Sequence, residues 1–315
     1  MAAYRQAARG LLVRMPRCRT GRQLVEHLIP GYITGWSSRE SELSSVKSLF
    51  VVEVEPSQVP FVVPIVSRTR EVGADFAKHL AARTHGTFAE DLDDVGLLDE
   101  FSVLRGPGFD PAQVDPLIRE FYEHTTRFTL DVVPQWCLGF KPAFWLFRKL
   151  FAERVGQFNL PFDAREAAQG VESHIDTVGF GDGKAVDLRC WVRVYRQSRL
   201  PLYVGIYTTL RHDDRGYVSV GFPLPFASVT STLRPTNQGT RLVLRTAFED
   251  GTVSGDYISL LNPATDRLTV FRIRQFHEEI EVFVENGQLL AHHRFYFLGR
   301  RFLTLVFTIQ RLPRA

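Results

Sequence analysis

Two adjacent histidines, His292 and His293, are the residues of this sequence best suited to proton transfer. They lie in an alternating segment, and adjacent side chains of a β-strand point to opposite faces of the sheet. One imidazole of the pair must therefore face inward, where it could exchange a proton with a ligand near neutral pH. We take His293 as the first catalytic candidate.

A second set of candidates comes from a strand that carries large aromatic side chains among arginines. In the stretch VDLRCWVRVY, one face carries Arg189, Trp191, Arg193 and Tyr195, and Tyr207 follows on the next extended segment. Rings that cover carbon, beside polar groups that hold oxygens, are typical of a pocket for an amphiphilic ligand. The alternative is an outer face whose rings pack under helices, and the sequence leaves that choice open.

These sets predict two kinds of role. Arg193, like His293, would polarise a carbonyl group and stabilise the negative charge that develops on it. Aromatic side chains would bind the substrate and give it shape. They are Trp191, Tyr195, Tyr207 and Tyr296.

A third catalytic candidate lies in the stretch FYEHTTRFTLDVVPQW, residues 121–136. The acid and proline at Asp115 and Pro116 indicate a helix start, and apolar side chains keep helical spacing as far as Phe128. His124 borders this apolar face and would reach the ligand if the helix covered the mouth of a barrel. The alternative is that the segment only clamps a helix onto the sheet, with His124 as a core histidine.

Signals for a metal, a cofactor or a covalent nucleophile are weak. Glu172, His174 and Asp176 share one face of a strand, a spacing that could hold a metal, but such a face is more often solvated. The three cysteines form no CxxC pair, and the glycine-rich segment 179–183 is predicted as a hairpin loop. We therefore expect no metal and no cofactor.

The spacing of apolar residues predicts an α+β protein. Residues 1–113 are predicted as a mixed helical and extended region, and residues 114–315 as two amphipathic helices followed by an antiparallel β-barrel. The second helix would begin at Pro142, run to about Val155 and be buried on most sides. About ten alternating strands follow, with a hairpin signal at 286–287. A meander of this length usually closes, here into a lipocalin-like barrel.

Composition and charge argue against some partners. The chain has 38 Lys and Arg against 35 Asp and Glu, a net charge of +3, without the basic stripe of a nucleic-acid-binding protein. Six arginines and no acid in residues 1–25 fit a transit peptide or a solvated helix face, and we favour no cleaved signal. No stretch approaches the roughly 18 apolar residues of a membrane helix. We expect no nucleic acid, no transmembrane segment and a cytoplasmic location.

Several distinctive stretches carry a family resemblance. They include FYEHTTRFTLDVVPQW, KPAFWLFRKL, VGQFNLP, RCWVRVYR, FPLP and the ending AHHRFYFLGRRFLTLVFTIQR. Over about residues 115–312 the chain resembles the C-terminal region of the uncharacterised YndJ-type bacterial family, and also hypothetical proteins of actinobacteria. The resemblance implies common descent and a β-rich domain, and it implies no reaction and no catalytic residues.

The expected architecture also resembles lipocalin-like cyclases of polyketide pathways, which enclose long apolar substrates. Such enzymes can act mainly by holding a chain in a reactive shape. Our first hypothesis is a cofactor-independent, ring-forming cyclase of bacterial antibiotic biosynthesis, for example a Diels–Alder-type cycloaddition catalyst, acting on a small-molecule apolar, polyketide-like substrate. One alternative is a non-catalytic lipid or polyketide carrier with the same cavity. Another is a protein-interaction module with a filled barrel.

Overall fold

The computed structural model of the chain describes residues that all lie in one compact unit, Leu43–Ala315. They are residues 50–55, 58–62, 72–90, 92–137, 139–179, 188–247 and 252–313. The arginine-rich residues 1–25 and most of the glycine-rich segment 179–183 lie outside the described residues. The division predicted at residue 113 stays a prediction.

About half of the described residues are in β-strands, as the alternation of apolar and polar residues predicted. Fourteen strands form one sheet, and every strand pair in it is antiparallel. The strands are β1 (Phe50–Val54), β2 (Thr87–Ala89), β3 (Phe128–Trp136), β4 (Val171–Gly179), β5 (Leu188–Tyr195), β6 (Pro201–His212), β7 (Arg215–Leu224), β8 (Ala227–Gln238), β9 (Arg241–Arg245), β10 (Gly255–Asn262), β11 (Arg267–Arg272), β12 (Phe276–Glu285), β13 (Gln288–Phe297) and β14 (Arg300–Arg311).

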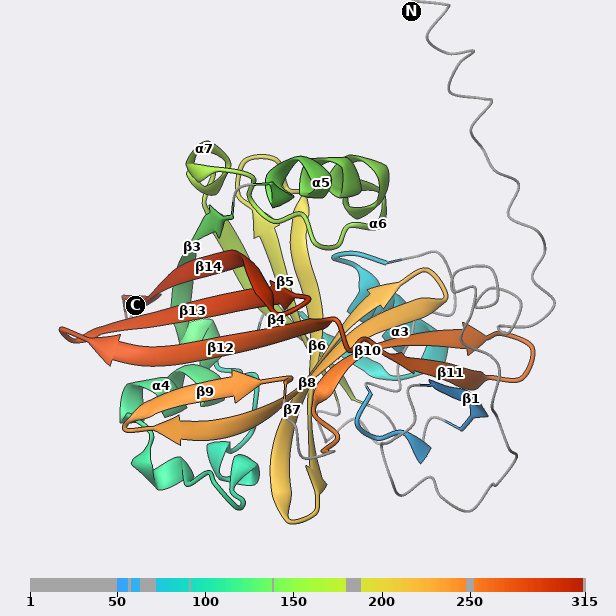
Figure 1. Cartoon of the computed structure of the whole chain (residues 1–315), viewed down its shortest axis with the longest axis horizontal. Helices are drawn as coiled ribbons and strands as arrows, with labels where there is room; N and C mark the ends of the chain where they lie inside the picture. Colours follow the sequence, from blue (N-terminus) through green and yellow to red (C-terminus); the bar gives the residue numbers. More distant parts are fainter. Residues whose placement is uncertain are drawn as a thin grey trace, which may run out of the picture. The chain divides into compact units, whose positions relative to one another are not determined.

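The sheet divides at β8. The first half of this strand pairs with β10, where Thr232 lies opposite Gly255, and the second half pairs with β9, where Thr236 lies opposite Val243. One branch continues from β10 to β11 and β1, and the other runs through β9, β12, β13 and β14 to β3. Figure 1 shows β12–β14 and the β10–β11 pair extending to opposite sides of β8.

The sheet bends around a core but does not close, so the predicted lipocalin-like barrel is not confirmed. Its end strands β2 and β3 each pair with one neighbour among the described residues. At one end β2 covers part of the edge of β4, and at the other Pro134 removes a backbone N–H from β3, as an edge strand allows. Core residues of both ends still meet, since Ile175 of β4 and Leu130 of β3 belong to one cluster.

Helices of the described residues are short and lie between the strands. The α-helices are α3 (Phe76–Thr84), α4 (Pro116–Glu123), α5 (Phe140–Phe147), α6 (Glu153–Val155) and α7 (Ala164–Ala167), with 3-10 turns η2 (Phe101–Leu104), η3 (Pro111–Gln113) and η4 (Thr125–Arg127) and the π-helical turn η5 (Arg148–Ala152). The predicted start of α4 is confirmed, because the Asp115 carboxylate accepts a hydrogen bond from the Leu117 backbone N–H at 2.8 Å.

The segment Phe121–Trp136 is part helix and part strand, which corrects the helix predicted as far as Phe128. α4 ends at Glu123, η4 makes a turn, and β3 begins at Phe128. The whole of β3 pairs with β14. Over a few residues, the spacing of apolar side chains fits a helix and a strand equally well. The pairing with β14 explains why residues 128–136 form a strand.

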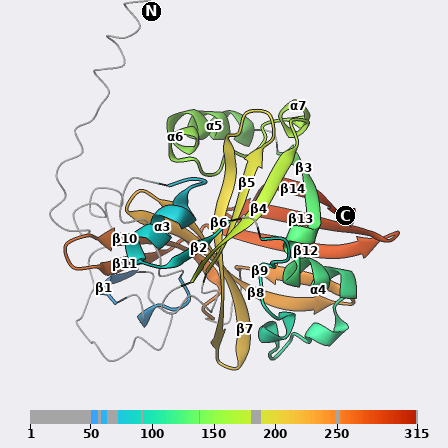
Figure 2. The ribbon, with the colours of Figure 1, turned by 180° about the vertical axis from the view of Figure 1, so that it is seen from behind.

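The sheet packs against an apolar core on each of its two faces. The inner face packs the larger core, into which Phe121 of α4 reaches, with its ring centroid 5.5 Å from that of Phe128 and 6.2 Å from that of Trp191. On the outer face, Phe76 and Ala81 of α3 cover a second core of small apolar side chains on β4, β5 and β6. Figure 2 shows α3 beside these strands. The layers separate an inner face, suited to a pocket, from an outer one.

The second predicted helix is present as α5, η5 and α6, but it is less buried than predicted. Phe144 packs on Trp136, with ring centroids 4.4 Å apart. Large apolar side chains on the other side of the helix point to solvent, including Trp145 with 52% of its surface exposed and Leu150 with 56%. We call Trp145, Leu146, Phe147 and Leu150 the α5 face. Figures 1 and 2 place this helix with α7 above the ends of β3, β5 and β6.

Candidate functional site

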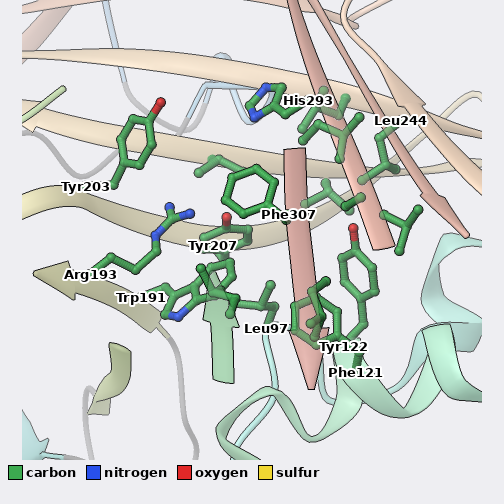
Figure 3. A pocket seen from close by; sticks show the side chains of 18 of the residues that line it. Leu97, Phe121, Tyr122, Trp191, Arg193, Tyr203, Tyr207, Leu244, His293 and Phe307 are labelled. Atoms are coloured by element: carbon green, nitrogen blue, oxygen red, sulfur yellow. The ribbon is translucent and has the colours of Figure 1, made fainter. Parts of the chain in front are cut away.

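A pocket of about 90 Å³ lies between the inner face of the bent sheet and α4. Its wall is mostly apolar and comes from β3, β5–β9, β12–β14, α4 and Leu97. A group of polar and aromatic side chains from β5, β6, β12 and β13 interrupts that wall. They are Trp191, Arg193, Tyr203, Tyr207, Glu278 and His293. Figure 3 shows Arg193 and Tyr203 on one side of the pocket and Leu244 and Tyr122 on the other.

A carboxylate–imidazole pair stands in this wall. Nε2 of His293 bonds the Glu278 carboxylate, and both side chains are largely buried, with 16% and 6% of their surfaces exposed. In the β12–β13 pair, Glu278 lies opposite Phe295 and Ile280 lies opposite His293. Glu278 and His293 are therefore diagonal neighbours on one face of the sheet. Such a pair can take up and release a proton inside an apolar pocket.

Arg193 brings a buried positive charge to the same pocket. Its guanidinium carbon lies 4.2 Å from the ring centroid of Trp191 and 4.7 Å from that of Tyr203, positions in which cation–π attraction offsets part of the desolvation cost. Among the described residues no carboxylate forms an ion pair with Arg193, and its buried Nε has no hydrogen-bond partner. The guanidinium therefore keeps donor capacity for an oxygen atom of a ligand.

Tyr203 and Tyr207 add two phenols on the same side of the pocket as Arg193, and Tyr122 of α4 lines the opposite side. Burial raises the pKa of Tyr207, the Arg193 charge and hydrogen bond lower it, and the Glu278 charge raises it. Burial also raises the pKa of Tyr203, with Arg193 acting in the opposite direction. Both phenols are hence protonated at neutral pH and can donate a hydrogen bond.

A second buried carboxyl group lies where the sheet divides. Asp256 of β10 accepts a hydrogen bond from Ser231 Oγ at 2.8 Å. Burial, and next the charge of Glu278, raise the pKa of Asp256 well above its usual range, against hydrogen bonds from Thr246 and Ser231. Two carboxylates close together in a dry site cannot both ionise easily, so Asp256 is the one that keeps its proton.

The structure brings four of the predicted site residues together and places three elsewhere. His293, Arg193, Trp191 and Tyr207 line the pocket. The others lie outside it, which departs from the predicted grouping. Tyr195 is in the same core but donates its hydroxyl to the Asn159 carbonyl at 2.9 Å, Tyr296 stacks on His277 with ring centroids 4.5 Å apart, and His124 Nδ1 bonds Asp94 Oδ1 at 2.7 Å near the surface.

The structure also decides which of the two adjacent histidines, His292 or His293, faces inward. Arg294, one residue beyond His293, points outward and bonds Glu279 at 2.8 Å and Glu281 at 2.7 Å. His292 lies on this outer face, 3.2 Å from the Arg294 guanidinium. His292 and Arg294 lie on the outer face because successive side chains of a strand point to opposite faces and His293 faces the pocket.

Sequence reasoning missed Glu278 and Asp256. A signal for Glu278 was available, since the turn at Asn286 and Gly287 fixes the register of β12 against β13 and sets this carboxylate diagonal to His293. Asp256 gave no such signal. Its place beside Glu278 depends on the division of the sheet at β8, which joins segments far apart in the chain.

This chain is thus a β-rich protein with an open, bent antiparallel sheet, and a mostly apolar pocket with a few polar side chains lies on the inner face of that sheet. Compared with known proteins, it is similar to the "Uncharacterized membrane protein YndJ" of Bacillus subtilis (strain 168), with 26% identity over 248 residues. The match covers 77% of this chain and 42% of YndJ, so the chain spans about two fifths of that relative's length. No family model and no solved structure matches.

The comparison supports the resemblance to the YndJ-type family, and it does not show the likeness to polyketide cyclases. It also corrects the expected cytoplasmic location, because the relative that aligns with most of the chain is named a membrane protein. In the part of the chain that the structure describes, no helix is both long and apolar enough to span a bilayer.

Proposed function

We propose that the pocket binds a small, mainly apolar carbonyl compound and transforms it by proton transfer, without a cofactor. The observation that carries the proposal is the convergence on one apolar pocket of the Glu278–His293 pair and of Arg193, which forms no ion pair with a carboxylate among the described residues. Burying an ionisable group costs free energy unless the group is paired and hydrogen-bonded, and buried ionisable groups with perturbed pKa values cluster at active sites.

Each polar side chain has a distinct role in this proposal. Arg193, together with the Tyr207 phenol, donates to the carbonyl oxygen and stabilises the charge that grows on it. Because Nε2 of His293 is held by Glu278, Nδ1 is the ring nitrogen that removes a proton from the carbon beside the carbonyl. Glu278 stabilises the imidazolium formed. The same imidazolium returns the proton after the enolate has reacted, so the protons balance.

Ring closure of a polyketide-like chain, the reaction expected from the sequence, is the finer form of this proposal. In it, the enolate carbon attacks a second carbonyl group of the same molecule. The pocket limits the substrate, since 90 Å³ is less than the roughly 150 Å³ of an engineered cavity that holds benzene. A long chain fits only after side chains of the wall move apart. A cycloaddition catalyst would use Arg193 but would leave the base without a role.

The alternative, a non-catalytic lipid or polyketide carrier, explains less of the pocket. A carrier of apolar molecules needs a wall of carbon. The pocket instead holds a buried cation and a buried carboxylate–imidazole pair. These features favour a catalyst over a carrier.

Hydrogen–deuterium exchange at the carbon beside a ketone tests the proton transfer without knowledge of the natural substrate. The protein is incubated in D₂O with acetone or 2-butanone, which have fewer heavy atoms than benzene, and loss of the α-proton signal is followed by NMR. We expect acceleration over buffer by the wild-type protein and a decrease of about 100-fold in His293→Gln. His124→Gln, at the surface, is the matched control and keeps the wild-type rate. No acceleration by the wild-type protein, or an equal rate in His293→Gln, contradicts the proposal.

A second candidate function concerns the α5 face, and we propose that it rests on a lipid membrane. Trp and Phe beside Lys on a short helix are typical of elements that lie in the membrane interface. Trp145 and Leu150 are exposed, Lys141 and Lys149 lie on the same helical segment, and the YndJ relative is named a membrane protein.

Co-sedimentation with phosphatidylcholine–phosphatidylserine vesicles tests this candidate. We expect the double variant Trp145→Ser, Leu150→Ser to lose binding by at least about tenfold, because the interfacial energy comes from buried apolar area. Leu298→Ser, at an exposed turn between β13 and β14, is the control and binds like wild type. Equal binding by the double variant and the control contradicts the candidate.

A further inference from the structure

Three side chains with metal-binding atoms meet on the outer face of the sheet, away from the pocket. β2 pairs with β4 so that Ala89 lies opposite Thr177. Glu90, the next residue, therefore comes beside Asp176, and His174 follows on the same face of β4. Ile175, between these two, points into the inner core, which places the group on the opposite side.

The distances within this group suit a metal ion. One carboxylate oxygen each of Glu90 and Asp176 and a ring nitrogen of His174 lie within 4.8 Å of one another. His174 Nε2 is 3.4 Å from Asp176 Oδ1. Two ligand atoms at about 2.0–2.1 Å from a tetrahedral zinc ion are about 3.4 Å apart. His174 and Asp176 already have this spacing, and exposed Glu90 can approach by side-chain rotation.

Asp176 supplies an independent indication of a ligand. Its side chain is 5% exposed, and its buried Oδ1 has no hydrogen-bond partner among the described residues. The contact with His174 lacks the geometry of a hydrogen bond. A buried carboxylate oxygen without a partner is costly, and this oxygen lies 3.4 Å from Nε2 of His174. A cation between them would satisfy it.

We propose that Glu90, His174 and Asp176 bind a divalent transition-metal ion such as Zn²⁺. An imidazole nitrogen with two carboxylate oxygens is a donor set for such ions, whereas Mg²⁺ and Ca²⁺ prefer oxygen ligands alone. Three protein ligands leave a fourth position for water. Bound there, the ion ties the end of β2 to β4 and stabilises this edge of the sheet.

The third ligand differs from the one that strand spacing suggests. Glu172 shares the face of His174 and Asp176, but its carboxylate bonds Arg199 at 2.6 Å and is exposed. Glu90, from another strand, takes its place. Glu172 is therefore a matched control, an acidic residue on the same face of the same strand that is outside the site.

Isothermal titration of the full, chelator-treated chain with Zn²⁺ tests the proposal, with Co²⁺ absorption as a second readout of coordination. We expect one bound ion per chain, a higher unfolding temperature with Zn²⁺, and at least about tenfold weaker binding in His174→Gln and Asp176→Asn. Glu172→Gln should bind like wild type. His174→Gln alters a partly exposed side chain, so it serves as the test if Asp176→Asn does not fold.

Two results overturn the proposal. One is a wild-type chain that binds neither Zn²⁺ nor Co²⁺ below about 1 mM. The other is binding by His174→Gln that equals binding by Glu172→Gln, since any ion would then sit elsewhere on the chain. Loss of Zn²⁺ binding in His174→Gln but not in Glu172→Gln supports the assignment.

Discussion

Glu278 on β12 and His293 on β13 are diagonal neighbours, and the carboxylate of Glu278 bonds Nε2 of the imidazole. The relation follows from the turn between the strands, where Asn286 and Gly287 take positive φ values of 51° and 76°. A tight turn of this kind fixes the register of both strands. The acid–base pair is thus set by local chain geometry, whereas the Arg193 that faces the same pocket comes from β5.

Replacing Glu278 by Gln tests the role of this pair. The amide keeps the size of the side chain but removes the charge that stabilises a protonated His293. We expect α-proton exchange of 2-butanone to slow by about tenfold or more, with an unchanged circular dichroism spectrum. Glu279→Gln is the matched control, because Glu279 points outward and pairs with Arg245 and Arg294. Equal rates in the two variants would remove Glu278 from the mechanism.

Asp256→Asn tests the protonation of the buried acid beside Glu278. The raised pKa of Asp256 in the folded protein means that the unfolded chain releases this proton first as pH rises. Its stabilising contribution is complete below the unfolded pKa of about 3.9 and is lost progressively above it. Asn can still accept from Ser231, so we expect the variant to gain stability relative to wild type between pH 4 and pH 8.

Urea unfolding at several pH values measures this difference. Carboxyl groups distant from Asp256 titrate alike in both proteins, so their effects cancel in the comparison, and Glu278, whose charge acts on Asp256, is the one neighbour named here that can differ. If the stability of Asp256→Asn minus that of the wild-type protein stays constant or falls as pH rises, then Asp256 is ionised in the folded protein.

Local patterns predicted strands, turns and helix starts well, because they depend on neighbours in the chain. The alternation in VDLRCWVRVY placed Trp191 and Arg193 on one face, and Asn286 and Gly287 placed the last hairpin. Whether the sheet closes into a barrel could not be predicted from local patterns. It depends on which edges remain free, and Pro134 and the short β2 occupy those edges.

Long-range contacts explain why some of the predicted site residues lie outside the pocket. Tyr195 lies on the same face of β5 as Trp191 and Arg193. It is at the end of the strand, however, where its hydroxyl donates a hydrogen bond to the Asn159 carbonyl. His124 lies past the end of α4 and meets Asp94 from a loop thirty residues earlier. Neither partner can be read from spacing within one element.

Gln157→Leu tests a buried side-chain amide that takes the place of backbone hydrogen bonds between β6 and β7. The register of β6 and β7 would set Val204 opposite Pro223, which has no N–H to donate. Gln157 fills this gap. Its Nε2 donates to the Val204 carbonyl at 2.9 Å and to the Pro223 carbonyl at 3.3 Å, and its Oε1 accepts from the Val204 N–H at 3.0 Å.

Leucine would leave these backbone groups buried and unsatisfied, at about 1–3 kcal/mol each. We expect Gln157→Leu to lower the free energy of unfolding by about 3 kcal/mol or more in urea titrations. Gln113→Leu, at an exposed position, is the control and should change it by less than about 0.5 kcal/mol. A similar small effect of both substitutions would mean that water or a relaxed backbone replaces the Gln157 amide.

Phe121 and His124 separate the structural and chemical roles of α4. The Phe121 ring is buried against Tyr122, Phe128 and Trp191. Phe121→Ala should therefore cost about 3–5 kcal/mol of unfolding free energy. His124→Ala removes only a half-exposed contact with Asp94, worth less than about 1 kcal/mol. Urea unfolding measures both variants. A His124→Ala protein that folds normally but no longer accelerates α-proton exchange would show that α4 takes part in the chemistry and does more than hold the sheet.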